Sequence, residues 1–589
     1  MSFLRRTDTC GNLRPENSGK PVILNGWVQT VRDMGGLIFI DLRDRYGITQ
    51  LVIEPETQAE LAEKSKELKS EYVIWAKGTV RLRENPNPRI PTGLIEILLD
   101  DFEIINKAEL PPFEIKDELD TNEELRLKYR FLDLRRPLLQ KYLITRNHVY
   151  NIVHKYFNEQ NFLEIETPVL MKSTPEGARD FLVPSRINKG RFYALPQSPQ
   201  IFKQILMISG FDRYMQIVKC FRDEDLRSDR QPEFTQVDVE MSFIERDDIF
   251  ELIEGLFKVL WKDVLGIDIQ TPFLKMPYRE AMMRYGSDKP DLRFGMEIKT
   301  ITDDMKSSGF KVFTDTLEAR GEIALINAKA CSEFSRKKLD DLTEYAKKYG
   351  AKGLAWMKFT PEGVNSPIAK FLSEAEIEAI KNKAEAETGD LLLIISDSWT
   401  RCYTVLGALR LEIARQTGIM ESVKNNYSFH WVIDFPLLDF DAEENRYIAM
   451  HHPFTSPMDE DLHLLESKPE TARAKAYDIV VNGAELGGGS IRIHQNEVQQ
   501  KMFSLLGFTK EDAELKFGYL LEALKYGAPP HGGVALGLDR IVMTLSGTEN
   551  IRDVIAFPKT TSGLSLMDGS PSYVDEKQLT ELGIKLAQQ

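Results

Sequence analysis

Residues 221–235 constrain the fold of this chain more than any other segment, because they place dense charge between two apolar stretches. Three arginines and five acids lie between Phe221 and Phe234. So much charge cannot enter a core without partners, and the pattern is too regular for a disordered tail. The segment predicts a hairpin-like loop between two strands. This loop would bind a polyanion, and its carboxylates would hold a metal ion or accept hydrogen bonds.

A second segment, residues 532–543, combines glycines with one arginine at the mouth of an apolar helix. Glycine allows a backbone to approach a ligand closely. A third segment, residues 478–494, carries Asp478 and Glu485 beside a run of glycines. The two acids are candidate oxygen ligands for Mg²⁺ beside phosphates, or they flank a tight turn as solvated acids.

The bulk composition indicates an ordinary soluble protein of several domains. The chain has 589 residues, 42% apolar and 28% charged, and a single core stops growing near ~250–300 residues. The net charge of −15 argues against generic polyanion binding, although a local patch can still bind nucleic acid. Four widely spaced cysteines fit neither a disulfide framework nor a zinc site. We therefore expect a reducing, cytoplasmic location, with no membrane span and no signal peptide.

The N-terminal residues 1–106 predict five strands and one helix. Strand patterns occur at 22–32, 37–44, 48–53, 72–82 and 94–105, with a helix at 58–68 after the third strand. This order is that of an OB-fold, which commonly binds oligonucleotides, and another small β-barrel fits the pattern equally well. Further on, a helix ends near Asn161 and an extended segment carries Pro168. Proline is confined to strand edges and bulges, so this segment is a sheet edge or a simple strand end.

Together, these segments resemble the three signature motifs of class II aminoacyl-tRNA synthetases. The resemblance runs from about residue 9 to 572 and is most specific to the bacterial-type aspartyl-tRNA synthetases. It implies an α+β multidomain chain with an N-terminal OB-fold β-barrel, a catalytic domain built on an antiparallel sheet flanked by helices, and an inserted α+β domain. The expected boundaries are an anticodon-binding barrel at 1–106, a hinge at 107–137, the catalytic domain at 138–287 and 426–565, the insertion at 288–425, and a C-terminal extension at 566–589.

The resemblance also implies an activity. It would be ATP-dependent conversion of L-aspartate to aspartyl-adenylate, followed by transfer to the 3′-terminal adenosine of aspartate tRNA by a homodimer. The alternatives are a relaxed enzyme that also charges asparagine tRNA, a silent tRNA-binding paralogue, and a ligase that passes activated aspartate to ammonia. The implied partners are ATP, aspartate, tRNA and a second copy of the chain, with Mg²⁺ as cofactor and neither DNA nor membrane.

Family motifs place the nucleotide site. Arg222 would bridge the α-phosphate and the substrate α-carboxylate, and Phe234 and Arg540 would sandwich the adenine. Arg222, Glu485 and Arg540 are the expected catalytic residues, and Asp478 and Glu485 the expected Mg²⁺ ligands. The full set expected at ATP is Arg222, Asp223, Glu224, Gln231, Phe234, Glu485, Gly537, Leu538, Asp539 and Arg540.

The same motifs place the aspartate site. Lys203 and Arg492 would hold the side-chain carboxylate, and asparagine would then leave both cations unpaired. Residues 173–180 resemble a mobile loop that closes over the substrate. His452 is expected to be a loop histidine with a polar partner. The full set expected at aspartate is Glu176, Ser198, Gln200, Lys203, Arg222, Asp238, His451 and Arg492.

In the barrel, Arg32, Phe39 and Gln50 match positions that read anticodon bases. Phe39 has a second interpretation as a core residue, because residues 37–40 are apolar throughout. The chain departs from many bacterial relatives at Thr30, at Val31 and in the loop 83–88, so the individual anticodon contacts stay open.

Overall fold

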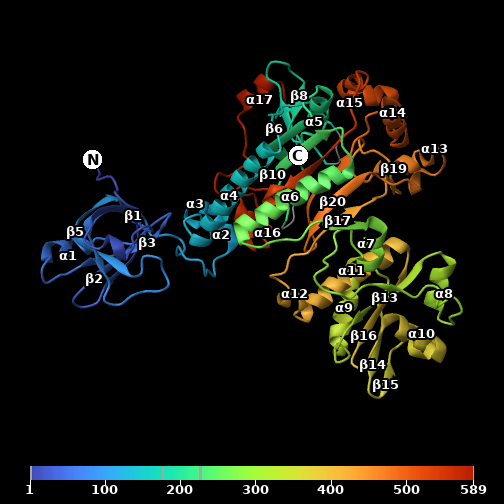
Figure 1. Ribbon diagram of the computed structural model, residues 1–589, viewed down its shortest axis with the longest axis horizontal. Coiled ribbons are helices and arrows are strands. Elements are labelled where there is room, and N and C mark those ends of the chain that lie inside the picture. The colour runs from blue at the N-terminus through green and yellow to red at the C-terminus, as the bar shows by residue number, and fades with distance from the viewer. Residues whose placement is uncertain (1–2, 175–177, 225–228, 588–589) are drawn as a thin grey trace. The chain divides into compact units, whose positions relative to one another are not determined.

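The computed structural model describes residues 3–174, 178–224 and 229–587 of the chain. These residues form two compact units, each assembled from segments that are far apart in the sequence. Figure 1 labels the helices and strands and colours them by residue number. The first unit comprises Met1–His148, Leu226–Gln231 and Ser546–Val574, and the second comprises Val149–Asp225, Pro232–Leu545 and Asp575–Gln589.

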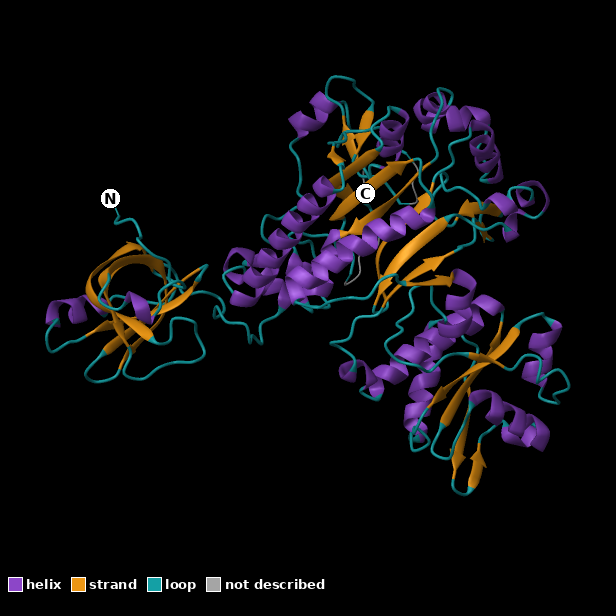
Figure 2. Cartoon of the chain, in the orientation of Figure 1, coloured by secondary structure: helices purple, strands orange, loops and turns teal. Residues whose placement is uncertain are grey.

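The first unit begins with a closed β-barrel of strand order β1-β2-β3-β5-β4 (Figure 2). Val22, Leu24 and Val28 alternate along the first strand and are buried in its core, as a half-buried strand requires. The five strands and the helix after the third strand are those expected from the sequence. They are β1 (Pro21–Asp33), β2 (Ile38–Asp44), β3 (Gly47–Ile53), α1 (Ala59–Ser65), β4 (Val73–Leu82) and β5 (Ile95–Asn106), preceded by the 3-10 turn η1 (Pro15–Asn17).

Short helices follow the barrel in the first unit. The Asn122 side chain caps the first of them by accepting a hydrogen bond from the Glu124 amide at 2.6 Å, which satisfies a helix-end donor. Pro137 opens the long helix at a position where no intrahelical donor is needed. The elements are α2 (Glu123–Lys128), α3 (Arg130–Asp133), the start of α4 (Pro137–Glu159) and the 3-10 turn η5 (Ile551–Val554).

The second unit is built on a sheet of order β11-β17-β20-β21-β22-β10-β9-β6. Its inner strands pair antiparallel, while β11 with β17 and β6 with β9 at the two edges pair parallel. The strands are β6 (Leu163–Glu164), β9 (Arg213–Phe221), β10 (Glu233–Ser242), β11 (Leu274–Pro277), β17 (Phe429–Ile433), β20 (Ala476–Val481), β21 (Ala484–Ile491) and β22 (His531–Gly537).

Helices cover this sheet, as expected for the catalytic domain. In α6 (Arg246–Leu265), Phe250 packs its ring 4.5 Å from Trp431 of β17 and 5.3 Å from Tyr477 of β20. Helix α5 (Gln200–Ile208) contacts β9 and β10, and α16 (Leu538–Ser546) follows β22. Strand residues alternate between sheet faces, so Asp238 and Glu240 of β10 point to one face together.

The predicted insertion contains a second sheet, of order β12-β13-β16-β14-β15, with helices on both faces. Leu391 and Leu393 pack on one face and Leu392 and Ile394 on the other, which explains the unbroken apolar run of this strand. Helix α7 (Tyr278–Tyr285) precedes the insertion. The elements of the insertion are β12 (Lys299–Thr300), α8 (Lys311–Glu318), β13 (Glu322–Ala328), α9 (Arg336–Lys348), β14 (Ala355–Thr360), β15 (Gly363–Asn365), η2 (Ala369–Phe371), α10 (Glu374–Ala384), β16 (Leu391–Asp397), α11 (Trp399–Gln416) and α12 (Ile419–Ser422).

Smaller elements complete the second unit. They are β7 (Leu182–Pro184), β8 (Phe192–Ala194), β18 (Leu438–Asp441), β19 (Arg446–Ala449), η3 (Asp459–Asp461), α13 (Leu464–Ser467), η4 (Pro469–Thr471), α14 (Asn496–Leu505), α15 (Lys510–Leu524) and α17 (Glu576–Leu582). Within the part of the chain that the structure describes, no helix combines the length and apolarity needed to span a membrane.

Candidate active site

A cavity of about 440 Å³ opens at the large sheet of the second unit, a size typical of small-molecule sites. Ten of the residues expected from the sequence line it: Ser198, Gln200, Lys203, Arg222, Glu224, Asp238, His451, Asp478, Glu485 and Arg492. Its wall also includes residues that the sequence analysis did not assign to the site, among them Gln197, Gln236, Asp288 and His452.

Two buried cations stand at one end of the cavity, each paired with carboxylates of β10. Lys203 Nζ lies 2.7 Å from Asp238 Oδ1 and 3.2 Å from Glu240 Oε2. Arg492 donates Nε–H to Glu240 Oε1 at 2.9 Å and Nη2–H to Oε2 at 3.1 Å. All four side chains are at most 2% exposed. Because two carboxylates face two cations, each buried cation has a carboxylate partner within the protein.

The pKa values of the two carboxylates are shifted in opposite directions from their usual values. For Asp238, burial raises the pKa, and Lys203 offsets this only in part. For Glu240, burial also opposes the charged form, but Arg492 and Lys203 outweigh it and hold the pKa below its usual value. Glu240 is therefore the firmly ionised member, since opposite charges on two sides favour its carboxylate.

Two further side chains orient Arg492. Its Nη1 lies 2.7 Å from His452 Nε2 and donates to Ser490 Oγ at 2.7 Å. Burial and the neighbouring Arg492 lower the pKa of His452 well below its usual value. The neutral imidazole can accept from the guanidinium, so His452 has the polar partner expected for it, and that partner is a site arginine.

Besides the two carboxylate oxygens of Asp238, three atoms of cavity-lining residues are buried without a hydrogen-bond partner among the described residues: Gln200 Nε2, Arg222 Nε and His451 Nδ1. Buried polar atoms in folded proteins nearly always have partners. Two of the three are donors in every protonation state. This arrangement suits a ligand that carries oxygen acceptors.

The two ends of the charged segment 221–235 pair as expected for a hairpin, with Phe221 of β9 opposite Glu233 of β10. The Arg222 amide donates to the Pro232 carbonyl at 2.9 Å, and the Arg222 guanidinium lies over the Phe234 ring at 5.1 Å. Residues 225–228 lie outside the described part of the hairpin. Arg222 thus stands at the cavity wall beside the aromatic face expected to receive adenine.

Arg179, in the described part of the segment 173–180, pairs with Asp223 after β9, because the Asp223 amide donates to the Arg179 carbonyl at 3.1 Å. Gln197 holds the loop as well. Its Nε2 donates to the Ala178 carbonyl at 2.8 Å and to Asp180 Oδ1 at 2.6 Å. Glu176, expected at the substrate ammonium, lies outside the described residues.

Asp478 and Glu485 face the cavity from the hairpin of β20 and β21. Asn482 and Gly483 make its turn with φ values of 53° and 80°, which Asn-Gly pairs adopt readily. The tight turn is therefore present, but the Asp478 side chain is only 14% exposed, so this acid is not freely solvated. Opposite it in register, Gly488 leaves room that a Cβ would fill, 2.3 Å from Asp478 Oδ1.

The acids suit a divalent cation. Burial, Glu485 and Asp288 raise the pKa of Asp478 well above its usual value, and a cation would relieve that crowding. Among the described residues, no group of three or more His, Cys, Asp or Glu side chains is placed to hold a metal ion. Mg²⁺ commonly takes one or two carboxylates and completes its shell with phosphates and water. Asp478 and Glu485 fit that donor set.

The glycine-rich strand β22 leads into α16. Arg540 Nη1 donates to the Glu485 carbonyl at 3.0 Å, beside the acid pair. Asp539 is buried and accepts from the Thr235 amide at 2.7 Å, so it ties α16 to β10. Gly537 and Leu538 lie at the β22–α16 junction. Phe234, Asp223 and residues 537–540 are outside the cavity lining defined above.

Gln231 belongs to the first unit, where its side chain is buried. It accepts from the Lys559 amide at 2.7 Å and donates to the Lys559 carbonyl at 3.0 Å. The next residue in the chain is Pro232, the backbone partner of Arg222.

The barrel has its own groove, of about 790 Å³, and all three expected anticodon residues line it. Phe39 is half-buried between the core residues Ile38 and Ile40, so it is not part of the barrel core. Gln50 donates to Glu96 Oε2 at 3.0 Å and accepts from Arg83 at 2.8 Å. Arg32 pairs with Asp41 at 3.0 Å. Arg83 directly follows β4, so the loop after that strand supplies one partner of Gln50.

Comparison with known proteins identifies the family. Residues 122–561 match the family model described as tRNA synthetases class II (D, K and N). This chain belongs to that family. The synthetase also matches, at residues 22–105, the model described as OB-fold nucleic acid binding domain, which decides between the two barrel interpretations.

Relatives of this synthetase match along its whole length. The aspartate–tRNA(Asp/Asn) ligase of Caldanaerobacter subterraneus subsp. tengcongensis is 55% identical over 588 residues, covering 100% of this chain and 99% of that protein. The aspartate–tRNA ligase of Clostridium botulinum strain Langeland is 55% identical over 582 residues, covering 99% and 98%. The asparaginyl-tRNA synthetase of Pyrococcus horikoshii, solved with asparaginyl-adenylate, shares the fold with a TM-score of 0.58 at 18% identity, covering 95% and 99%.

Sequence reasoning missed several residues of this synthetase site. Glu240 could have been found, because Val237–Met241 alternates two acids with apolar residues in a strand, an arrangement that needs buried cations. Asp288 is the first residue of the predicted insertion, so nothing in the sequence indicated that it would line the cavity wall. His452 and Gln197 act through loop contacts, for which periodicity gives no signal.

Proposed function

We propose that this synthetase is an aspartate–tRNA ligase that forms aspartyl-adenylate from L-aspartate and ATP and then charges aspartate tRNA. The observation that carries the proposal is the pair of buried cations, Lys203 and Arg492, in the cavity of a class II synthetase. The ammonium group of a lysine substrate only donates, so it would face the N–H donors of these two cations without an acceptor between them. An acidic side chain is the complementary partner.

In the first step, the substrate α-carboxylate attacks the α-phosphorus of ATP and pyrophosphate leaves. Arg222 is suited to hold the two reacting groups together, because its planar fork binds phosphate and carboxylate oxygens. Phe234 and Arg540 would hold adenine between them. Positioning and charge neutralisation supply most of the acceleration in such transfers, so a protein nucleophile is not required.

Other residues of the site would bind the metal ion and the amino acid. Asp478 and Glu485 would hold Mg²⁺, which neutralises phosphate charge when bound. Ser198, Gln200, Glu176 and Asp238 would surround the substrate ammonium, and His451 would contact the amino acid. An ammonium group only donates, so Gln200 would contact it through Oε1. Gln200 Nε2, a buried donor that lacks a partner among the described residues, is left for an oxygen acceptor of the ligand.

Selection against asparagine has a different cause from the one expected from sequence. Lys203 and Arg492 already have carboxylate partners, so asparagine would not leave them unpaired. Instead, its amide NH₂ would face the N–H groups of two cations, donor against donor. A site built to donate to a carboxylate rejects such an analogue by the cost of unmade hydrogen bonds.

In the second step, a ribose hydroxyl of the terminal adenosine attacks the adenylate carbonyl and AMP leaves. The barrel would bind the anticodon, with Phe39 stacking on a base and Gln50 and Arg32 reading polar edges. We also propose that the enzyme is a homodimer through the segment around Pro168. Its four cysteines are buried free thiols, which suits a reducing cytoplasm.

Charging assays test the proposal. Purified enzyme is given ATP, Mg²⁺ and aspartate with aspartate tRNA, with asparagine tRNA, or with ammonia. Charging of aspartate tRNA is the expected result. Asparagine formation from ammonia without tRNA would contradict it, and loss of all activation would favour the silent paralogue. Charging of asparagine tRNA as well would identify the relaxed form, which the Caldanaerobacter relative's name describes.

A further inference from the structure

A buried arginine of the insertion, Arg410 in α11, binds the chain segment that leads from α7 into the insertion. Arg410 is 1% exposed. It donates Nη2–H to the carbonyls of Asp291 and Phe294, at 2.8 and 2.7 Å, and Nε–H to the carbonyl of Gly295 at 3.2 Å. Its guanidinium also lies over the Phe294 ring at 4.0 Å. One side chain therefore fixes three backbone carbonyls within five consecutive residues.

The same helix holds the start of this segment. Helices α7 and α11 pack against one another (Figure 1). Gly286, which ends α7 with a φ of 68°, approaches Gly407, which lies about one turn before Arg410 in α11. A Cβ on Gly286 would lie 2.7 Å from Gly407 Cα, and a Cβ on Gly407 would lie 2.5 Å from the Gly286 carbonyl oxygen. The segment 286–295 is therefore held against α11 at both of its ends.

Asp291, the first residue that Arg410 binds, packs against the turn between the two proposed metal ligands. Asp291 is 2% exposed, and Arg293 holds its carboxylate with Nε–H to Oδ1 at 3.0 Å and Nη2–H to Oδ2 at 2.6 Å. A Cβ on Gly483 would lie 3.2 Å from Asp291 Cβ. Gly483 belongs to the turn of the β20–β21 hairpin, whose strands carry the two ligands. Asp291 therefore supports that hairpin.

A short, stiff link joins Asp291 to Asp288, which lines the cavity. The two residues between them are Lys289 and Pro290. Proline has a fixed φ, and it also restricts the residue before it. The Lys289 amide donates to Ser287 Oγ at 3.1 Å as well. The place of Asp288 in the cavity wall is therefore set by the contacts that hold Asp291.

Asp288 adds negative charge at the metal end of the cavity. After burial and Glu485, it is the third influence that raises the pKa of Asp478, and a divalent cation relieves such crowding. Among the described residues, no three acidic or metal-binding side chains are placed to share an ion. Asp288 would therefore act on the cation through its charge, outside the ligand pair.

We propose that Arg410 is a positioning residue for Mg²⁺: by fixing Asp291, it holds Asp288 in the cavity wall and supports the β20–β21 hairpin. The insertion thereby takes part in adenylate formation. This inference rests on the proposed function, which assigns Asp478 and Glu485 to Mg²⁺. Guanidinium presents five donors in a planar fork, whereas the lysine ammonium is a point charge with three. Arg410→Lys therefore keeps the charge but lacks the fork that spans the carbonyls.

The experiment titrates the full-length enzyme with Mn²⁺ alone, as a probe of the Mg²⁺ site, and follows free Mn²⁺ by electron paramagnetic resonance. For Arg410→Lys we expect the Kd for Mn²⁺ to rise about tenfold, the low end of what losing a supporting contact costs at a metal site. In aspartate-dependent pyrophosphate exchange, the Mg²⁺ concentration that gives the half-maximal rate should rise by a similar factor. The KM for aspartate should stay unchanged, and excess Mg²⁺ should restore the rate.

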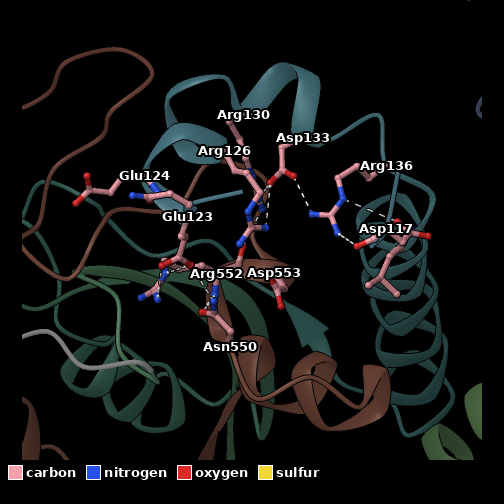
Figure 3. Close-up of polar contacts among 12 residues, drawn as sticks. Asp117, Glu123, Glu124, Arg126, Arg130, Asp133, Arg136, Asn550, Arg552 and Asp553 are labelled. Carbon is pink, nitrogen blue, oxygen red and sulfur yellow. Dashed lines mark hydrogen bonds and ion pairs between the residues drawn. The ribbon is translucent and has the colours of Figure 1, made fainter. Parts of the chain in front are cut away.

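Arg130→Lys is the matched control. Arg130 of α3 is likewise buried, at 3% exposed, and it also binds three backbone carbonyls, those of Arg552, Ile555 and Ala556, each at 2.9 Å (Figure 3). The segment that it fixes contains none of the residues that line the cavity. Arg130→Lys should therefore lower thermal stability, as Arg410→Lys does, yet leave the Kd for Mn²⁺ unchanged.

An unchanged Kd for Mn²⁺ in folded Arg410→Lys would overturn the proposal. An equal rise in Arg130→Lys would overturn it too, because general loosening would then explain both results. If Arg410→Lys does not fold, Pro290→Ala loosens the link between Asp291 and Asp288 and should raise the Kd, and an unchanged value there would overturn the proposal. A parent enzyme that supports exchange but binds no Mn²⁺ would overturn this inference alone, whereas absence of exchange in the parent would refute the proposed function.

Discussion

Arg492 and Glu240 meet through two parallel hydrogen bonds, Nε to Oε1 at 2.9 Å and Nη2 to Oε2 at 3.1 Å. Because this pairing fixes the guanidinium plane, it directs Nη1 toward His452 and Ser490. Glu240 thereby sets the orientation of the cation proposed to hold the substrate side chain.

Replacing Glu240 by glutamine should lower the free energy of unfolding by roughly 3–5 kcal/mol at neutral pH, the cost of leaving a buried charge without its partner. Chemical denaturation of the full chain measures this. Glu344→Gln is the control, because that exposed glutamate pairs with Lys347 at the surface, where such changes stay within about 0.5 kcal/mol. Equal stability of the two variants would contradict the assignment.

The same pair predicts a pH dependence. Burial opposes ionisation of Glu240, but Arg492 and Lys203 hold its pKa below the usual value. A carboxylate whose pKa is lower in the folded than in the unfolded chain stabilises the folded state fully at pH values above its unfolded pKa of about 4.3. This stabilisation is lost as the pH falls through the folded-state pKa. The stability difference between the parent and Glu240→Gln should therefore be constant near neutral pH and shrink below about pH 4.3. A difference that widens on acidification would argue against an ionised Glu240.

Gly533 makes room for Glu240, since a Cβ at this position would lie 2.1 Å from Glu240 Oε2 and 2.0 Å from the Val239 carbonyl. Gly533→Ala should displace the carboxylate and lower aspartate activation about 100-fold, which corresponds to roughly 3 kcal/mol. Gly518→Ala in α15 is the control, because open space surrounds that position. It should leave activation unchanged and stabilise the helix by about 0.5–1 kcal/mol.

The barrel groove predicts a separation of the two reaction steps. Phe39→Ala combined with Gln50→Ala should leave pyrophosphate exchange intact, because adenylate formation needs no anticodon. Charging of aspartate tRNA should weaken by the ~1–3 kcal/mol of a lost stacked base, with a further share for the hydrogen bond. Since Phe39 is half-buried, the thermal transition of the barrel should change little. If the double variant charges aspartate tRNA normally, the groove does not bind the anticodon and has another role.

The segment after α4 predicts a dimer. Val169 and Leu170 are 50% and 51% exposed in the single chain, and exposed apolar residues beside Pro168 suit an interface between two copies. Val169→Glu should shift sedimentation at micromolar concentration from dimer toward monomer and lower activity with it. A parent enzyme that sediments as a fully active monomer would refute the interface.

Much of the fold and many of the cavity residues could be predicted, because long motifs carry them. Lys203 and Arg492 came from motif matches, and the barrel strands came from alternation along β1. The alternation in Val237–Met241 indicates a buried acid at Glu240, but its surroundings depend on register: Glu240 stands opposite Gly533 of β22, a pairing that residues almost 300 positions apart do not reveal. The partners of the cations were missed for the same reason, and with them the reason why asparagine is disfavoured.

The most direct test of the account is pyrophosphate exchange driven by L-aspartate or L-asparagine, in the parent enzyme and in Lys203→Leu and Arg492→Leu. We expect exchange with aspartate and little with asparagine in the parent, and a loss of about two to four decades in either variant that still folds. Near-normal aspartate-dependent exchange without either cation, or equal exchange with asparagine, would contradict the account.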